Sequence, residues 1–309
     1  MNISAVIATA DRAESLWATL QSLARQDLHP DEIIVVDASV DEKTKRTCEQ
    51  GVPALLSPIR WVRAETRGAA GQRNQGVKIA AHPLIWFFDD DVIFEQECMR
   101  RLWSALLDDP KLGGANAMII NQSYKKPGAA SRAVFTLLHG QKEKTFAGKV
   151  IGPAVNLLPE DDEELPALVR VEWLNTTCTM YRREALPDPP FDPFFEGYSL
   201  MEDLALSLTV AKRGWKLANV RIARVIHNSQ PGAHKDDVVK RAAMELRNRL
   251  YVMEELLRQN EVSDYLRLLL WESFGLVSSV ANRDGARYFL PSLMGKIQCL
   301  RDRRGARGR

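Results

Sequence analysis

Three consecutive aspartates, Asp89 to Asp91, directly follow the apolar run "LIWFF" at residues 84–88. The run predicts a buried strand, and adjacent like charges at its end repel one another unless a positive group lies nearby. Carboxylate oxygens are the ligands that Mg²⁺ and Mn²⁺ prefer, and these ions keep coordination positions open for substrate phosphates. The three residues therefore predict a divalent-cation site that binds a diphosphate. The alternative is that they form a turn or cap a helix.

Further polar residues follow two other predicted strands. Thr9 and Asp11 come after the strand at residues 3–8, and Asp37 ends the strand in "DEIIVVDAS". Ligands of open α/β sheets bind outside the carboxyl ends of the strands, so we expect these side chains on one rim with the three aspartates. Asp11 is also expected to cap the helix that follows it, which is predicted from Leu16, Leu20 and Leu23 on one face. For Asp37, a role as a turn former explains the sequence equally well.

A second acidic pair begins a predicted helix. Glu202 and Asp203 precede the periodic apolar residues of "LALSLTVAKRGW", and the helix dipole favours the ionised form of a carboxylate at this end. An ionised carboxylate can take the proton of a hydroxyl group as that group attacks an electrophile. The pair therefore predicts a general base, and the alternative is that both residues are capping charges.

The elements that position these residues alternate between strand and helix. Helices separate strands that are predicted at residues 3–8, 32–37, 59–64, 84–88 and 115–121. This order is typical of a doubly wound α/β layer. A strand is also predicted within "VEWLNTTCTMYRREAL", and another ends at His227.

The alternation is interrupted twice along the chain. Residues 121–170 are polar and charged, which favours an insertion or a loop region, and from residue 235 onward the pattern is helical and rich in Arg and Leu. We therefore predict an α/β domain at residues 1–232 and a helical C-terminal extension at residues 233–309.

The composition is that of an ordinary soluble protein, because 45% of its 309 residues are hydrophobic and 27% are charged. A net charge of +2 is too small to indicate a nucleic-acid partner. The four cysteines form no C-x-x-C pair, which argues against a zinc site or a disulfide framework and fits a reducing cytoplasm. The N-terminus lacks the basic start of a signal peptide, and no apolar segment is long enough to span a bilayer. We expect a cytoplasmic protein.

Four segments, taken in order, resemble the family 2 glycosyltransferases with the GT-A fold. They are "SAVIATADRAESLWATLQSLARQ", "EIIVVDAS", "GAAGQRNQGVKIA" before "WFFDDDV", and "FFEGYSLMEDLALSLTVAKRGWKL" with a histidine after the next strand. Each segment alone is weak evidence for the family, whereas the four segments in this order, which cover residues 2–230, are specific to it. The resemblance implies an α/β fold with a mostly parallel sheet flanked by helices. It also implies inverting transfer of a sugar from a UDP-, GDP- or dTDP-linked donor.

The resemblance implies roles for residues on the nucleotide side. Asp37 matches the aspartate that contacts the base, Asp89 the acidic residue near the ribose, and Arg73 a basic residue near the nucleotide. The other members of the implied nucleotide-sugar site are Thr9, Asp11 and Asp90. Many relatives have D-D-G-S or D-N-G-S where this chain has "DASV", so Ala38 removes a polar contact and leaves the identity of the base open.

The resemblance also implies a metal site and a base. Asp91 matches the ligand of the D-x-D motif, and His227 matches a position that helps to hold the metal or the diphosphate, with Mn²⁺ or Mg²⁺ as the cofactor. Asp203 matches the catalytic base. The alternatives are that His227 is a simple strand-end residue and that Arg73 is a surface residue, one helical turn from Val77.

An acceptor pocket is expected near the acidic pair, because sugar faces stack on aromatic rings. Its candidate residues are Trp173, Phe194, Phe195, Tyr198 and Glu202, and core packing is the alternative for the aromatic ones. The resemblance implies a glycan or lipid-linked acceptor in the synthesis of cell-surface polysaccharide or glycolipid.

Two rival classes share parts of this pattern. A sugar nucleotidyltransferase, unlike a metal-dependent phosphatase, would need a glycine-rich basic loop after the first strand, and "ATADRAES" contains no glycine. A non-catalytic sugar-binding relative would not need Asp91 or the base Asp203. The sequence therefore favours a glycosyltransferase.

The C-terminal extension combines apolar helices with a basic tail. The segment "VKRAAMELRNRLYVMEELLRQ" places Leu246, Leu250, Met253 and Leu257 at helical spacing, and the chain ends in "RDRRGARGR". This combination suits an anionic membrane surface and a peripheral location on the cytoplasmic membrane face. The alternative is that the helices pack on the core or on a second subunit of a homodimer.

Overall fold

The computed structural model describes residues 2–195, 197, 200–229, 237–280 and 283–307, in two compact units. The first unit comprises Met1–Lys125, Ala147–Lys149 and Leu157–Gln230, and the second comprises Lys126–Phe146, Val150–Asn156 and Pro231–Arg309. Residues 126–146 and 150–156, which the predicted domain boundary assigns to the α/β domain, thus group with the C-terminal helices.

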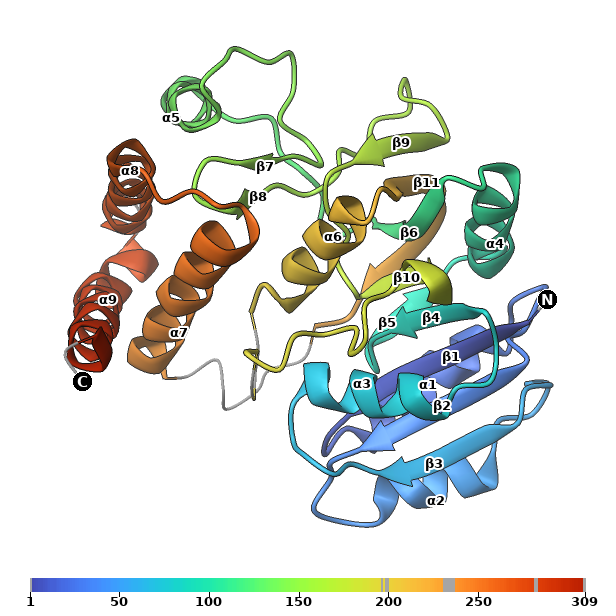
Figure 1. The fold of residues 1–309 in the computed structure, drawn as a ribbon. Helices are drawn as coiled ribbons and strands as arrows, with labels where there is room; N and C mark the ends of the chain where they lie inside the picture. Colours follow the sequence, from blue (N-terminus) through green and yellow to red (C-terminus); the bar gives the residue numbers. More distant parts are fainter. Residues whose placement is uncertain (1, 196, 198–199, 230–236, 281–282, 308–309) are drawn as a thin grey trace. The chain divides into compact units, whose positions relative to one another are not determined.

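The first unit is built on a sheet whose N-terminal half is parallel (Figure 1). Its neighbouring strands are β3 (Ile59–Arg63), β2 (Glu32–Asp37), β1 (Ile3–Thr9) and β4 (Leu84–Phe88). β1, β2 and β4 are buried along almost their whole length. Burial on both faces explains why their sequences are continuous apolar runs rather than alternating ones.

A mixed set of strands completes this sheet in the order β3-β2-β1-β4-β10-β6-β11-β5, with β9 also paired to β11. β10 (Cys178–Arg182) lies between β4 and β6 (Leu112–Ile119) and is antiparallel to both. β11 (Lys216–His227) is parallel to β6 but antiparallel to β5 (Val92–Phe94) and β9 (Leu168–Val171). The predicted mostly parallel α/β layer is confirmed, and the strand predicted around Cys178 is the antiparallel insertion within it.

Helices flank the sheet, as the alternating pattern predicted. They are α1 (Ala13–Leu23), α2 (Lys43–Gln50), α3 (Ala69–Ile79), α4 (Cys98–Asp108) and α6 (Glu202–Lys212). α1 buries Leu16, Leu20 and Leu23, the residues whose spacing predicted it. α3 packs on β1 and β2, and α4 packs on β6 and β11. α6 ends just before Gly214, whose φ of 91° terminates the helix.

The prediction that Asp11 caps α1 is wrong. Arg12 occupies the N-cap position, and Asp11 has a left-handed backbone with φ 58°. This conformation turns the Asp11 carboxylate toward the connection after β2, where it accepts a 2.7 Å hydrogen bond from the Val40 N–H and pairs with Arg67. The bond from Val40 is the main reason why the pKa of Asp11 lies below its usual value.

The second unit is mainly helical. Its elements are α5 (Ala129–His139), β7 (Val150–Ile151), β8 (Val155–Asn156), α7 (Val238–Tyr251), a π-helical turn (Val252–Leu256), α8 (Val262–Val280) and α9 (Arg283–Arg307). Leu246 and Leu250 of α7 and Met253 of the π-helical turn are buried together with Leu268 and Cys299, which confirms the predicted apolar face for these three residues, whereas Leu257 is half-buried. No helix among the described residues is long and apolar enough to cross a membrane.

Candidate active site

The predicted rim forms at one edge of the sheet. Thr9 and Asp37 are direct partners in the parallel register of β1 and β2, and β4 delivers Asp89 beside them on the other side of β1. β11 ends with His227, which pairs with Val92 of β5. The strand ends that the sequence placed on one rim are therefore brought together.

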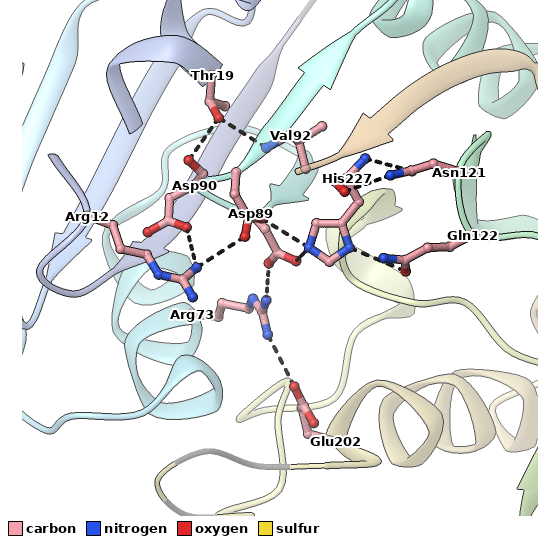
Figure 2. Close-up of polar contacts among 11 residues, drawn as sticks. Arg12, Thr19, Arg73, Asp89, Asp90, Val92, Asn121, Gln122, Glu202 and His227 are labelled. Carbon is pink, nitrogen blue, oxygen red and sulfur yellow. Dashed lines mark hydrogen bonds and ion pairs between the residues drawn. The ribbon is translucent and has the colours of Figure 1, made fainter. Parts of the chain in front are cut away.

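Asp90 and Asp91 are the two buried members of the acidic run, with 3% and 4% of their surfaces exposed. Asp90 is held by its hydrogen bonds. Its carboxylate accepts a hydrogen bond from Thr9 Oγ1 at 2.5 Å. It also accepts one from Arg12 Nη1 at 3.1 Å, and its backbone carbonyl accepts one from Thr19 Oγ1 (Figure 2). Burial raises the pKa of Asp90 to about 6 in spite of these bonds. Asp90 thus fixes the turn after β4, because its carboxylate and its backbone carbonyl are bonded to Thr9, Arg12 and Thr19.

Asp89, Asp91 and His227 form the group that could hold a metal ion. Each offers one ligand atom, and these atoms all lie within 4.8 Å of one another. His227 Nε2 is 3.1 Å from Asp91 Oδ1 and 4.0 Å from Asp89 Oδ2. Two carboxylates and one imidazole are a donor set that suits Mn²⁺ or Mg²⁺, which favour oxygen ligands and leave positions for phosphate. The prediction assigned Asp91 and His227 to the metal, and the structure adds Asp89 to the group.

His227 is held in this position by Asn121 and Gln122, which follow β6. Its backbone N–H donates to Asn121 Oδ1 at 3.1 Å, and Asn121 Nδ2 donates to the His227 carbonyl at 2.9 Å. The other ring nitrogen, Nδ1, lies 3.4 Å from Gln122 Oε1, which leaves Nε2 directed at the carboxylates (Figure 2). Such contacts on the second ring nitrogen commonly orient a metal-binding histidine.

Arg12 is the residue of this site that sequence reasoning missed. Its Nη1 lies 3.1 Å from Asp90 Oδ1 and 3.2 Å from Asp91 Oδ2. The argument that adjacent carboxylates require a positive neighbour was correct, and the chain itself supplies part of that charge. A basic residue just after the first strand, on the rim that collects the aspartates, was the signal that could have revealed it.

Arg73 joins the acidic run to the second acidic pair. It is 4% exposed, so the alternative of a surface helix residue is wrong. Its Nη2 donates to Asp89 Oδ1 at 2.6 Å, and its Nη1 lies 3.5 Å from Glu202 Oε1 (Figure 2). One guanidinium thus links the end of β4 to the start of α6.

Glu202 and Asp203 are both less acidic than the helix dipole alone would make them. Burial raises the pKa of Glu202 to about 8, and the charge of Asp203 adds to that rise. Burial also raises the pKa of Asp203 to about 6, with a further contribution from the charge of Asp89. Asp203 Oδ1 accepts a 2.7 Å hydrogen bond from the Leu204 N–H, which opposes this rise. At pH 7 Glu202 is therefore mainly protonated, whereas Asp203 is mainly ionised and can accept a proton.

Asp37 lies on the rim, but it is fully buried. Its two carboxylate oxygens accept hydrogen bonds from the Ser39 N–H at 2.8 Å and from Trp61 Nε1 at 3.0 Å. Contact between Asp37 and a nucleotide base would require Trp61 to move. The predicted role of Asp37 in base recognition stays a prediction.

The aromatic acceptor candidates are only partly described. Trp173 is 4% exposed, and its Nε1 donates to the Leu157 carbonyl at 2.8 Å, as a core residue would. Tyr198 lies outside the described residues. Glu202 is buried against Arg73, so its role in binding an acceptor stays a prediction.

Comparison with protein families finds one matching model, described as Glycosyl transferase family 2, over residues 4–187. No curated protein sequence matches the chain.

Solved structures resemble the chain at low sequence identity. A mannosyltransferase from Pyrobaculum calidifontis, PcManGT, in complex with GDP-Man and Mn²⁺, is 14% identical, with a TM-score of 0.56 over 97% of this chain and 87% of that one. S. aureus TarS in complex with UDP-GlcNAc is 16% identical, with a TM-score of 0.58 over 97% and 81%. GalNAc-T7 with UDP, GalNAc and Mn²⁺ is 16% identical, with a TM-score of 0.55 over 74% and 44%. These likenesses confirm the predicted GT-A fold.

Proposed function

We propose that this chain, which belongs to glycosyl transferase family 2, moves a sugar from a nucleoside-diphosphate donor to a hydroxyl acceptor with inversion at the anomeric carbon. Family membership makes the chain a glycosyltransferase, as predicted, rather than a nucleotidyltransferase. The observation that carries the finer proposal is the grouping of Asp89, Asp91 and His227 at the rim of the sheet, where a diphosphate and its cation would bind.

The cation proposed for this group is Mn²⁺ or Mg²⁺, held by Asp89, Asp91 and His227. PcManGT and GalNAc-T7 were both solved with Mn²⁺, which supports the choice. When bound, such an ion supplies Lewis-acid stabilisation of the leaving diphosphate without any proton transfer.

The chain's own residues supply the proton acceptor. Asp203 is the proposed base, because its pKa of about 6 leaves it ionised near neutral pH and still able to take the proton of an acceptor hydroxyl. The acceptor oxygen attacks the anomeric carbon from the face opposite the diphosphate, and this direct displacement inverts the configuration. Arg73 keeps Asp89 in place and lies against Glu202, so a single residue joins the donor side to the base side.

The nucleotide side is proposed to involve Thr9, Asp11, Asp37, Arg73, Asp89 and Asp90. Thr9 and Asp90 act on the ligand through the turn that they hold, since they bond each other at 2.5 Å. The similar structures carry both GDP- and UDP-linked ligands, so the base of the donor is left to experiment.

The acceptor is proposed to be a glycan or a lipid-linked glycan in surface polysaccharide or glycolipid synthesis, reached from an anionic membrane surface. α8 supports this proposal, because an exposed stripe of Val262, Leu266, Leu269, Val277 and Val280 runs along it without a charged residue. On α9, exposed Leu290, Met294 and Ile297 lie with exposed Arg287 and Arg301. Amphipathic helices with basic residues bind anionic lipid surfaces, and the alternative occupant is a second copy of the chain.

A thermal-shift series tests the proposed donor and cation. UDP-, GDP- and dTDP-sugars are added with Mn²⁺, with Mg²⁺ or with a chelator, and release of nucleoside diphosphate is followed with the same donors. A ligand that binds only the folded chain raises Tm by mass action, so one donor should stabilise the protein only when a cation is present. The proposal is wrong if no nucleoside-diphosphate sugar stabilises the chain or releases its diphosphate with either metal.

A further inference from the structure

The segment that leads into α6 is attached to α3 by Asn74. The amide Nδ2 of Asn74 donates to the Phe191 carbonyl at 2.7 Å, and its Oδ1 accepts from the Phe191 N–H at 2.8 Å. One planar side chain therefore satisfies both backbone polar groups of a residue that belongs to no helix or strand. This is the same pair of bonds that a neighbouring strand would make.

Phe191 is also fixed through its ring. The side chain is fully buried and packs edge-on against Phe87 of β4, with ring centroids 5.3 Å apart. The guanidinium of Arg73 lies 5.5 Å from the centre of the same ring. Backbone and ring contacts together give the start of this segment a single position against α3 and β4.

A second attachment holds the segment near its other end. Gly68, the N-cap of α3, forms a parallel backbone bridge with Gly197. A Cβ atom added to Gly68 would lie 2.8 Å from the Gly197 carbonyl oxygen, so the two backbones are as close as glycine allows. After Gly197, the contact between Arg73 and Glu202 joins α3 to the first residue of α6.

α3 is itself anchored independently of these contacts. Gln72 Nε2 donates to the carbonyls of Thr9 at 2.8 Å and Val36 at 2.7 Å, which ties the helix to the ends of β1 and β2. At the opposite end, Arg183 donates to the carbonyls of Val77 and Ala80. Loss of the Asn74 contacts would thus release the segment without moving the helix that borders the donor side.

We infer that Asn74 is a positioning residue for the transfer step: its two hydrogen bonds to Phe191 fix residues 191–195, which lead toward α6, and thereby help to place Asp203 against the acceptor hydroxyl. The inference rests on the proposed function of Asp203 as the base. A misplacement of about 1 Å in a reacting group can lower a rate by about 10²-fold. Release of the segment is therefore expected to act on turnover rather than on donor binding.

The test compares Asn74→Ala, Asn74→Asp and Asn74→Ser with the full-length parent. Backbone amide exchange is measured by mass spectrometry over residues 188–201, together with the Kd of the donor and the kcat of transfer. Asn74→Ala is expected to speed exchange in this segment and to lower kcat by roughly 10-fold to 10²-fold, with a donor Kd within about twofold of the parent. Asn74→Asp should behave like Asn74→Ala, because it keeps the acceptor for the Phe191 N–H but places a carboxylate oxygen against the Phe191 carbonyl. Asn74→Ser is the milder variant and should be intermediate.

Gln75→Ala is the matched control. Gln75 carries a side-chain amide on the same helix, but its Oε1 accepts from the Glu65 N–H and its Nε2 donates to the Arg63 carbonyl. Because Gln75 makes neither bond to Phe191, exchange over residues 191–197 should stay at the parental rate. Three results for Asn74→Ala would each overturn the inference. The first is exchange at the parental rate, and the second is faster exchange with an unchanged kcat. The third is a donor Kd that rises as much as kcat falls. A parent that transfers no sugar from any donor would refute the proposed function instead, and the exchange comparison would still test the attachment.

Discussion

Arg73 Nη1 lies 3.5 Å from Glu202 Oε1, although 129 positions separate the two residues in the sequence. The same guanidinium donates to Asp89 at 2.6 Å. Glu202 therefore lies next to a cation, and burial still raises its pKa to about 8, because the loss of hydration outweighs the attraction to Arg73.

The raised pKa of Glu202 predicts how stability depends on pH. The folded chain binds this proton more tightly than the unfolded chain does, because the pKa rises from 4.5 to about 8 on folding. The resulting stability is fully present below pH 4.5 and is lost as the pH rises through about 8. Glu202→Gln cannot ionise, so its free energy of unfolding should fall less than that of the parent between pH 6 and 9 in urea titrations. Parallel curves for the two proteins would contradict this prediction.

Asp91→Ala should abolish metal-dependent donor binding and leave the fold intact, since Asp91 lies at the rim and is one of three ligand groups. Calorimetric titration with Mn²⁺ and the donor-induced rise in Tm measure the loss, and circular dichroism checks the fold. Asp41→Ala serves as the control, because Asp41 is exposed and pairs only with the exposed Lys43 among the described ion pairs. Binding of Mn²⁺ and nucleotide at the parental level would show that the cation site is wrongly assigned.

Asp203→Asn should separate binding from chemistry. Asparagine keeps the size of aspartate and its hydrogen bond from Leu204 but cannot take a proton. The Kd of the donor should stay at the parental value, while kcat falls by roughly 10²-fold or more. Unchanged turnover would exclude Asp203 as the base and make Glu202 the first candidate.

The pKa of Asp203 predicts the acid limb of the rate profile. The base works only when it is ionised, so kcat should rise with pH through about 6 and level off near pH 7. Glu202 is still protonated over this range, because its pKa is about 8, so Glu202→Gln should leave the limb near pH 6. Rate measurements from pH 5 to 8 with saturating donor provide the check. A flat profile over this range would refute the assignment.

Flotation with liposomes tests the membrane proposal. The chain should float with anionic vesicles at low salt, and binding should weaken with added salt and with removal of residues 301–309, since each basic residue near the surface contributes about 1 kcal/mol. Leu269→Glu on the apolar stripe of α8 should also weaken binding. Leu137→Glu on α5 is the matched control, because the two leucines are exposed to nearly the same extent, 62% and 63%. A chain that stays in solution with anionic vesicles and is dimeric by light scattering would favour packing between subunits.

The sequence by itself determined the layer and its rim. The apolar runs that end at Thr9, Asp37 and Asp89 are local patterns, and neighbouring parallel strands must bring such ends to one edge. The spacing of Leu16, Leu20 and Leu23 likewise fixed α1, because helical periodicity depends only on nearby residues.

Tertiary structure alone decided which side chains meet at that rim. Arg12 lies beside Asp90 and Asp91, which are 78 and 79 positions away, and Asn74 bonds Phe191 from 117 positions away. The left-handed backbone of Asp11 places its side chain away from the helix N-terminus, and Trp61 Nε1 donates a hydrogen bond to one carboxylate oxygen of Asp37. Periodicity records whether a residue faces the core or the solvent, whereas the partner of a polar side chain depends on how distant segments pack. The rim was therefore predictable from the sequence, and the hydrogen bonds and ion pairs that arrange it required the folded chain.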